Sequence, residues 1–82
     1  MAKAVLLPPF STQWFGGREE IVVSGAATIF ALVRALETQA PGFAEAAQRR
    51  AAVAVNGQAI ADWSRQLAEA DEVLFVPKIA GG

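Results

Sequence analysis

Residues 71–82 read Asp-Glu-Val-Leu-Phe-Val-Pro-Lys-Ile-Ala-Gly-Gly, and this stretch decides how the rest of the chain can be arranged. An acidic turn leads into an unbroken apolar run at residues 72–76, which predicts a buried strand. The tail after this strand reaches about 20 Å from Pro77 to Gly82 when fully extended. Because glycine has no side chain, Gly81 and Gly82 predict an end that fits a channel too narrow for other residues. The alternative is an inert end with no function.

The composition predicts one folded domain with a modest core. The chain has 82 residues, 54% of them hydrophobic and 18% charged, which is typical of a globular domain and not of a disordered one. A net charge of −1 gives no reason to expect nucleic acid or an anionic membrane as a partner. The sequence contains no cysteine and no histidine, so disulfides, thiolate chemistry and imidazole catalysis are excluded.

The N-terminal apolar run is too short for a signal peptide, and no segment is long enough to span a bilayer. We therefore expect a cytoplasmic protein.

Four further segments have strand character. The first is stopped by Pro8-Pro9, and Phe10–Gly17 then forms a connection whose glycine pair suits a turn to the second strand. Two strands joined in this way are expected to form a hairpin with a long loop. Asn56-Gly57 is the strongest turn signal in the chain and predicts a hairpin. The four predicted strands are residues 2–7, 18–23, 52–55 and 58–60.

One clear helix is predicted between the second and third strands. Thr28 suits its N-cap, and Pro41-Gly42 ends it. Its apolar residues follow the spacing i, i+3, i+4 and i+7, which puts Ile29, Leu32, Val33 and Leu36 on one face. Residues 43–50 have helix-forming composition without a clear stripe, and predict one or two loose turns. Residues 62–70 form a connection with a buried anchor at Leu67.

This order of elements predicts an α+β roll, with a mixed sheet of about five strands packed on one main helix. The first and last strands would lie parallel at the centre of the sheet, as in a β-grasp (ubiquitin-like) fold. The expected division is a β-grasp domain at residues 1–76 and an extended tail at residues 77–82.

Side chains of the last strand alternate between the two faces of the sheet, and one helix covers only one face. If Val73 and Phe75 point at the helix, their neighbours point away from it. An apolar patch beside the tail is then expected, and such a patch usually marks a partner surface. Its residues would be Val5, Leu7, Leu74 and Val76. Alternatively, the loop with Trp14 and Phe15 folds back and covers this patch.

Other residues have both a functional and a structural interpretation. Trp14 and Trp63 form either a ligand-stacking pair or satellite core. The pair Arg49-Arg50 either meets an acidic partner or is a solvated helix end that complements the helix dipole. Three acidic residues (Glu69, Asp71 and Glu72) are interpreted as turn residues whose negative charge attracts a basic partner, and not as a cation site. Lys78 either contacts an acidic group of a partner or only increases the solubility of the chain.

The sequence contains no Ser-His-Asp set, no phosphate-binding loop and no paired catalytic carboxylates. The chain by itself is poorly equipped to be an enzyme.

The final dozen residues resemble the C-terminal signature of the MoaD/ThiS family of sulfur carriers. That signature combines an acidic turn, an apolar strand, proline and a small residue before Gly-Gly. The run Val53-Ala54-Val55-Asn56-Gly57 is similar to the hairpin of the family. The resemblance covers essentially the whole chain, and the Phe-Val-Pro run at residues 75–77 is closest to the small subunit of molybdopterin synthase. Two positions differ from this signature. Ala70 stands in the acidic turn where a glycine is common, and Lys78 stands where a second proline is frequent.

The resemblance implies that Gly82 is adenylated by a ubiquitin-activating-type enzyme, which uses ATP and magnesium, and is then converted to a thiocarboxylate. No cofactor would be bound by the chain itself. Gly81 would accompany Gly82 in the activating site, and the apolar patch would dock on the large catalytic subunit of molybdopterin synthase or on another sulfur acceptor. Partner contacts along the tail would come from Lys78, Ile79 and Ala80.

Two other functions stay open at this point. The sulfur could serve the synthesis of thiamine or cysteine or the thiolation of tRNA. A Gly-Gly tail on a β-grasp domain can also form isopeptide bonds with lysines, which would make the chain a protein modifier.

Overall fold

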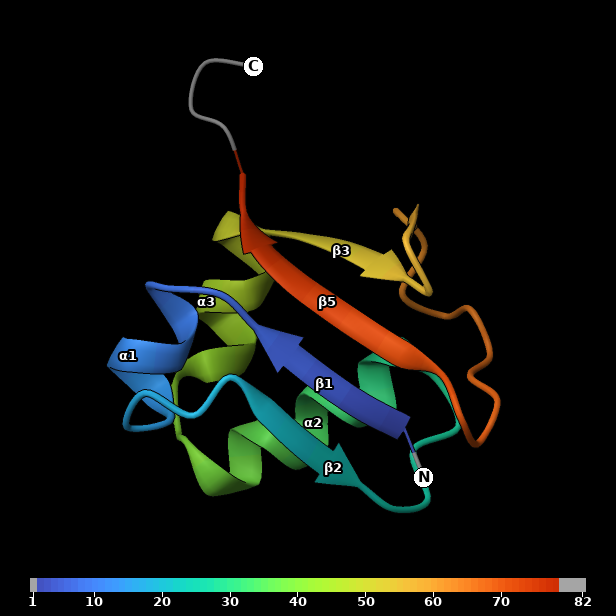
Figure 1. The fold of residues 1–82 in the computed structure, drawn as a ribbon, viewed down its shortest axis with the longest axis horizontal. Coiled ribbons are helices and arrows are strands. Elements are labelled where there is room, and N and C mark those ends of the chain that lie inside the picture. The colour runs from blue at the N-terminus through green and yellow to red at the C-terminus, as the bar shows by residue number, and fades with distance from the viewer. Residues whose placement is uncertain (1, 79–82) are drawn as a thin grey trace.

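The computed structural model describes residues 2–78, which form one mixed sheet with helices packed on one of its faces (Figure 1). The strand order across the five-stranded sheet is β2-β1-β5-β3-β4. The strands are β1 (Ala2–Leu6), β2 (Glu20–Val23), β3 (Ala51–Val55), β4 (Gln58–Ala59) and β5 (Glu72–Pro77).

The central position of β5 is confirmed. It runs parallel to β1, with Leu6 opposite Phe75, and antiparallel to β3, with Val53 opposite the same Phe75. β1 also pairs antiparallel with β2, which confirms the predicted first hairpin. The chain therefore has the β-grasp arrangement, in which the first and last strands lie side by side at the centre of the sheet.

The main helix, α2 (Ile29–Gln39), begins where the sequence predicts. The backbone N–H of Ala31 donates to the hydroxyl of Thr28 at 3.1 Å, so Thr28 is the N-cap. The predicted apolar face is the buried one, because Ile29, Leu32, Val33 and Leu36 all lie in the core.

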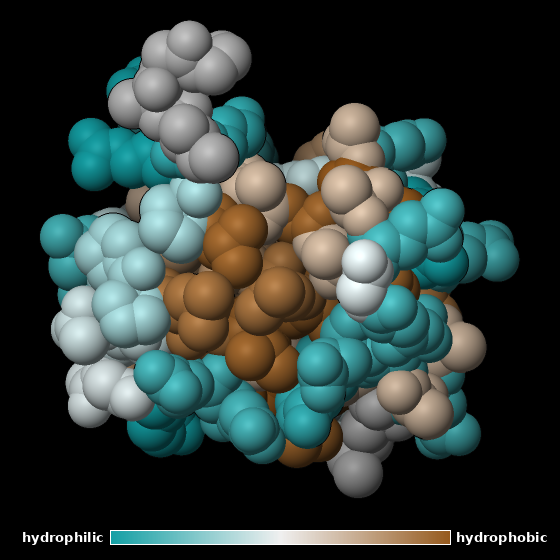
Figure 2. All heavy atoms as spheres, turned by 45° about the horizontal axis from the view of Figure 1, so that its top comes forward, coloured by the Kyte–Doolittle hydropathy of each residue, from teal (hydrophilic) through white to brown (hydrophobic). Residues whose placement is uncertain are grey.

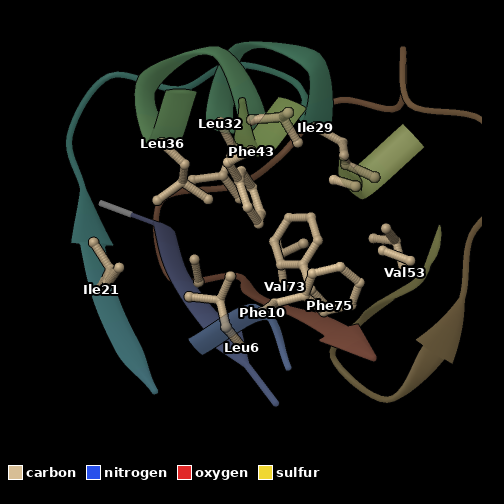
Figure 3. Close-up of a cluster of buried hydrophobic side chains, with 14 of the residues drawn as sticks. Leu6, Phe10, Ile21, Ile29, Leu32, Leu36, Phe43, Val53, Val73 and Phe75 are labelled. Atoms are coloured by element: carbon tan, nitrogen blue, oxygen red, sulfur yellow. The ribbon is translucent and has the colours of Figure 1, made fainter. Parts of the chain in front are cut away.

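The core fills the space between the helices and the sheet (Figure 3). Its centre is a group of phenylalanine rings packed edge to face, a favourable geometry for aromatic pairs. The ring of Phe43 lies 5.7 Å from that of Phe75 and 6.3 Å from that of Phe10, measured between centroids. Phe15 packs on the same ring at 5.2 Å.

The prediction that Phe10–Gly17 is only a connection is wrong, because its first part is a short helix, α1 (Phe10–Trp14). The amide of Gln13 donates to the carbonyl of Pro9 at 2.8 Å, and Phe15 ends the helix. Five residues are too few for helical periodicity to show in the sequence. The helix is held by the burial of Phe10 and Phe15 against Phe43, a residue distant in sequence.

The loose turns predicted at residues 43–50 are also a regular helix, α3 (Phe43–Arg50). Its N-terminus is capped from α2, because the Glu37 carboxylate accepts hydrogen bonds from the amides of Gly42 and Ala44 at 2.9 and 2.8 Å. These bonds also lower the pKa of Glu37, the bond from Ala44 contributing most. Only Phe43 and Ala47 are buried, so the apolar stripe is too short to recognise in the sequence.

The remaining boundaries differ from prediction by one or two residues. β1 ends before Leu7, β2 begins at Glu20, β3 begins at Ala51, β4 ends at Ala59 and β5 continues to Pro77. The predicted anchor, Leu67, is only half-buried. Its backbone amide donates to the carbonyl of Ala27 at 2.8 Å, which ties the connection at residues 62–70 to the segment before α2.

Substitution of Phe75 tests the core, and the adjacent Leu74 supplies the control. Phe75→Ala removes a fully buried ring, which costs about 3–5 kcal/mol of unfolding free energy. This is a large part of the stability of so small a domain. Leu74→Ala, on the opposite face of the same strand, costs about 1 kcal/mol or less. Urea denaturation followed by circular dichroism compares the two, and equal losses would contradict this assignment of faces.

Candidate functional site

The face of the sheet away from the helices carries an apolar patch. Val5 on β1 lies opposite Leu74 on β5, and both are half-buried, as is Val76. Leu7 continues the patch with 38% of its surface exposed. Figure 2 shows a continuous hydrophobic area ringed by hydrophilic residues on this side of the molecule. We call Val5, Leu7, Leu74 and Val76 the open-face patch, and the structure brings all four predicted residues together.

The loop after β1 does not cover this patch. Phe15 is only 5% exposed and packs on Phe43, on the helix side of the sheet. Trp14 lines a groove beside α3 and contacts Gly42. The alternative in which Trp14 and Phe15 fold over the open face is therefore wrong.

One member of this face, Val22 on β2, was not predicted from the sequence, and 57% of its surface is exposed. A signal for it exists in the sequence, because Val22 alternates with Ile21 and Val23, whose side chains are buried. Phe30 on α2 is a second missed exposed residue, 51% exposed, and its ring packs edge to face on Trp63 at 5.6 Å.

Charged groups lie at the start of the central strands. The ammonium group of Lys3 lies 3.1 Å from the carboxylate of Glu72 and 3.6 Å from that of Glu20. The hydrogen bond with Glu72 is the main cause that raises the pKa of Lys3, followed by the charge of Glu20. The polar rim of the patch at this end is therefore a surface ion cluster.

The acidic turn before β5 is fixed by a pair of side chains. The Asp71 carboxylate accepts hydrogen bonds from the Ala68 amide at 2.8 Å and from the Asn56 side-chain amide at 2.9 Å. The Asn56 oxygen in turn accepts from the Glu72 amide at 2.9 Å. This pair joins the β3–β4 turn to the start of β5, and so sets the register of the central strand. We call Asn56 and Asp71 the turn clamp.

The opposite end of β5 leads to the tail. The amide of Lys78 donates to the carbonyl of Arg50 at 2.7 Å, so the last described residue is still held against the end of α3. Four predicted site residues (Ile79, Ala80, Gly81 and Gly82) lie outside the described residues.

The other candidate residues are placed as follows. Trp14 and Trp63 are not a stacking pair, because Trp14 packs on Gly42 while Trp63 packs on Phe30. Arg49 and Arg50 lie in the last turn of α3. Within residues 2–78, no group of three or more His, Cys, Asp or Glu side chains is arranged to hold a metal ion. The same residues contain no helix of the length and apolarity that a membrane span requires.

Comparisons with known proteins agree with this geometry. The family model described as the ThiS family matches residues 5–82. No protein of curated function matches the chain in sequence.

Several solved structures have the same fold. CysO of Mycobacterium tuberculosis, described as an antigen, has a TM-score of 0.83 at 19% identity, covering 96% of this chain and 100% of its own. SAMP1 of Haloferax volcanii has a TM-score of 0.69 at 25% identity, covering 99% and 98%. The complex of subunits 1 and 2 of the molybdopterin-converting factor from Helicobacter pylori gives 0.68 at 20% identity, covering 99% and 97%.

The hydrogen bonds of the turn clamp predict a contribution of Asp71 to stability that depends on pH. The hydrogen bond from Ala68, then that from Asn56 and the charge of Arg65, lower the pKa of Asp71. A carboxyl group whose pKa is lower in the folded state stabilises the protein above its unfolded pKa of about 3.9, and loses this effect as the pH falls through the folded value. Asn56→Gly keeps the left-handed backbone of Asn56 (φ 50°) but removes its side chain. We expect the Asp71 pKa to rise toward its usual value in this variant.

Carboxyl NMR titration of the wild type and of Asn56→Gly measures this change directly. The Asp62 carboxyl is the internal control, because its lowered pKa is caused by Ser64 and not by Asn56. An unchanged Asp71 pKa in Asn56→Gly would show that the clamp has no electrostatic role.

Proposed function

This chain is a member of the ThiS family, and on that premise we propose that it is a sulfur carrier whose Gly82 carboxyl is converted to a thiocarboxylate. The observation that supports the proposal most is the family match over residues 5–82, which includes the Gly-Gly end. Members of the family are small ubiquitin-like carriers that serve as substrates of enzymes. This agrees with the absence of cysteine and histidine from the sequence.

The proposed reaction divides into two steps that a partner enzyme catalyses. First, an oxygen of the Gly82 carboxylate attacks the α-phosphorus of ATP, with magnesium on the phosphates, and pyrophosphate leaves. A hydrosulfide ion, or a sulfur donor equivalent to it, then attacks the carbonyl carbon. The carbon–sulfur bond forms as the bond to AMP breaks. Adenylation is needed because a free carboxylate is a poor electrophile with a poor leaving group.

The open-face patch is the proposed docking surface for the enzymes that load and unload the tail. It lies on the same strand that leads into the tail, because Leu74 and Val76 precede Pro77 on β5. Docking on this face therefore fixes where the tail starts relative to the partner. An exposed apolar patch loses contact with water when a partner covers it, which favours association.

For the sulfur acceptor, we propose the large catalytic subunit of molybdopterin synthase. The Phe-Val-Pro run at residues 75–77 supports this choice, as does the fold shared with the H. pylori molybdopterin-converting factor, which is a two-subunit complex. The higher TM-score with CysO favours a carrier of that kind as the second candidate. A role as protein modifier is the alternative outside sulfur transfer.

Intact mass spectrometry tests the carrier function. The purified chain is incubated with ATP, magnesium, a sulfur source and the adenylating enzyme of its own organism, beside a variant that lacks Gly82. We expect a mass gain equal to the exchange of one oxygen for sulfur, in the wild type only. No gain with an enzyme that is active on another carrier would overturn the proposal. Adducts on lysines of other proteins would identify a modifier instead.

Charge placed in the open-face patch tests the docking surface. Leu74→Glu puts a carboxylate at the centre of the patch without touching the core, so the fold should persist. We expect at least about a tenfold increase in the KM for the carrier, since burying an unpaired charge is costly. Thr38→Glu adds the same charge at an exposed position on α2, on the helix side, and is the control. Equal KM values for the two variants would exclude docking through this face.

A further inference from the structure

A second surface lies at the base of the tail, on the helix side of the sheet. It is a groove of about 710 Å³ between α1, α3 and the end of β5. Trp14 and Pro77 line its apolar part, and its basic residues are Arg49, Arg50 and Lys78. These are three of the seven lysines and arginines in a chain whose net charge is −1. We call this the basic groove.

The tertiary structure assembles the groove from distant parts of the sequence. Pairing of β3 with β5 places Ala51 opposite Pro77, and the Lys78 amide bonds to the Arg50 carbonyl at 2.7 Å. The lysine at the start of the tail is therefore held beside the arginines at the end of α3.

Most of the positive charge in the groove is not neutralised. Arg49 has a carboxylate partner, Glu45, at 3.6 Å, and both side chains are well exposed, so this pair is weak. Among residues 2–78, no carboxylate lies within ion-pair distance of Arg50 or Lys78. The carbonyl groups at the end of α3 offer only partial negative charge. The groove thus presents two cations that have no ion-pair partner among the described residues, together with their hydrogen-bond donors.

At the opposite end of β5, three carboxylates (Glu20, Asp71 and Glu72) share two cations (Lys3 and Arg65), so this end keeps a small excess of negative charge. The central strand therefore runs from negative to positive charge toward the tail. A partner with acidic groups around the entrance of its active site would attract the tail end of the carrier and repel the other end. Such a charge pattern orients a protein during encounter and raises its association rate.

The distance from Lys78 to Gly82 determines which negatively charged groups of a partner the basic groove can contact. Gly82 is the fourth residue after Lys78, which is about 13 Å away when the tail is extended. A tail that is extended into an active site therefore keeps these cations away from the phosphate of an adenylate on Gly82. They instead face the protein surface around the entrance.

From these observations we infer that the basic groove binds an acidic segment of the adenylating enzyme, at the entrance of the site that receives the tail. This inference rests on the proposed function and adds the chemistry of the partner surface. Arg50 and Lys78 would pair with aspartate or glutamate side chains of the enzyme. They act in binding and orientation and not in the chemical step.

Charge reversal tests the groove with the adenylating enzyme of the same organism. Pyrophosphate release is measured against carrier concentration for Arg50→Glu, Lys78→Glu and the double variant. We expect the double variant to raise KM about tenfold or more at low salt with kcat unchanged. Added salt should narrow the difference, because the Debye length falls from about 10 Å at 0.1 M to about 3 Å at 1 M. Arg50→Lys combined with Lys78→Arg should keep the wild-type KM.

Arg34→Glu is the matched control for each single variant, because Arg34 is an exposed arginine on α2 that does not line the groove, and its reversal changes the net charge as much as Arg50→Glu or Lys78→Glu does. Lys78 lies outside every helix and strand, so Lys78→Glu still reports on the groove if Arg50→Glu destabilises α3. A wild-type KM in the double variant, or a rise of KM in Arg34→Glu equal to that in Lys78→Glu, would overturn the inference. A fall in kcat alone would also overturn it and place the cations near the adenylate.

Different results would overturn the carrier function and the acidic contact at the basic groove. If the wild type gains sulfur and the double variant has the same KM, the groove proposal is wrong and the carrier function stands. If the wild type gains no sulfur, the carrier function is wrong, and calorimetric binding to the enzyme without ATP decides the groove. Weaker binding of Lys78→Glu than of Arg34→Glu would uphold the acidic contact, and equal binding would exclude it.

Discussion

The pairing of β5 with strands on both of its sides is the constraint on which the rest of the structure depends. β1 and β3 take up its backbone hydrogen-bonding groups, so the strand is fixed in position and register. Its side chains then alternate between two environments. Val73 and Phe75 fill the core, while Leu74 and Val76 form part of the open-face patch. One strand therefore provides both the centre of the core and the proposed docking surface.

Register matters especially in such a strand, because a slip of one residue would exchange its two faces. The turn clamp opposes that slip at the start of β5, where Asp71 and Asn56 tie the acidic turn to the β3–β4 turn. At the other end, the bond from Lys78 to Arg50 holds the strand against α3. Both ends of β5 are thus fixed by contacts that also place Lys78, the patch and the basic groove relative to one another.

Under the proposed function, the chain supplies the reactive carboxyl group and its partners supply the catalytic groups. Two of its carboxylates are engaged in structure, Glu37 at the start of α3 and Asp71 in the turn clamp. An apolar face and a basic groove lie on either side of the strand that leads into the tail. This is the arrangement expected of a protein that presents one reactive end to enzymes, and the catalytic groups would then belong to those enzymes.

The sequence by itself determined the succession of strands along the chain, the main helix, the two faces of β5 and the family. It could do so because these features depend on local signals: the alternation around Phe75, the cap at Thr28 and the Asn56-Gly57 turn. Only the tertiary structure decided the helices α1 and α3, because their stability comes from distant partners, Phe43 for α1 and Glu37 for α3. The basic groove was likewise hidden, since strand pairing and not sequence proximity brings Lys78 to Arg50.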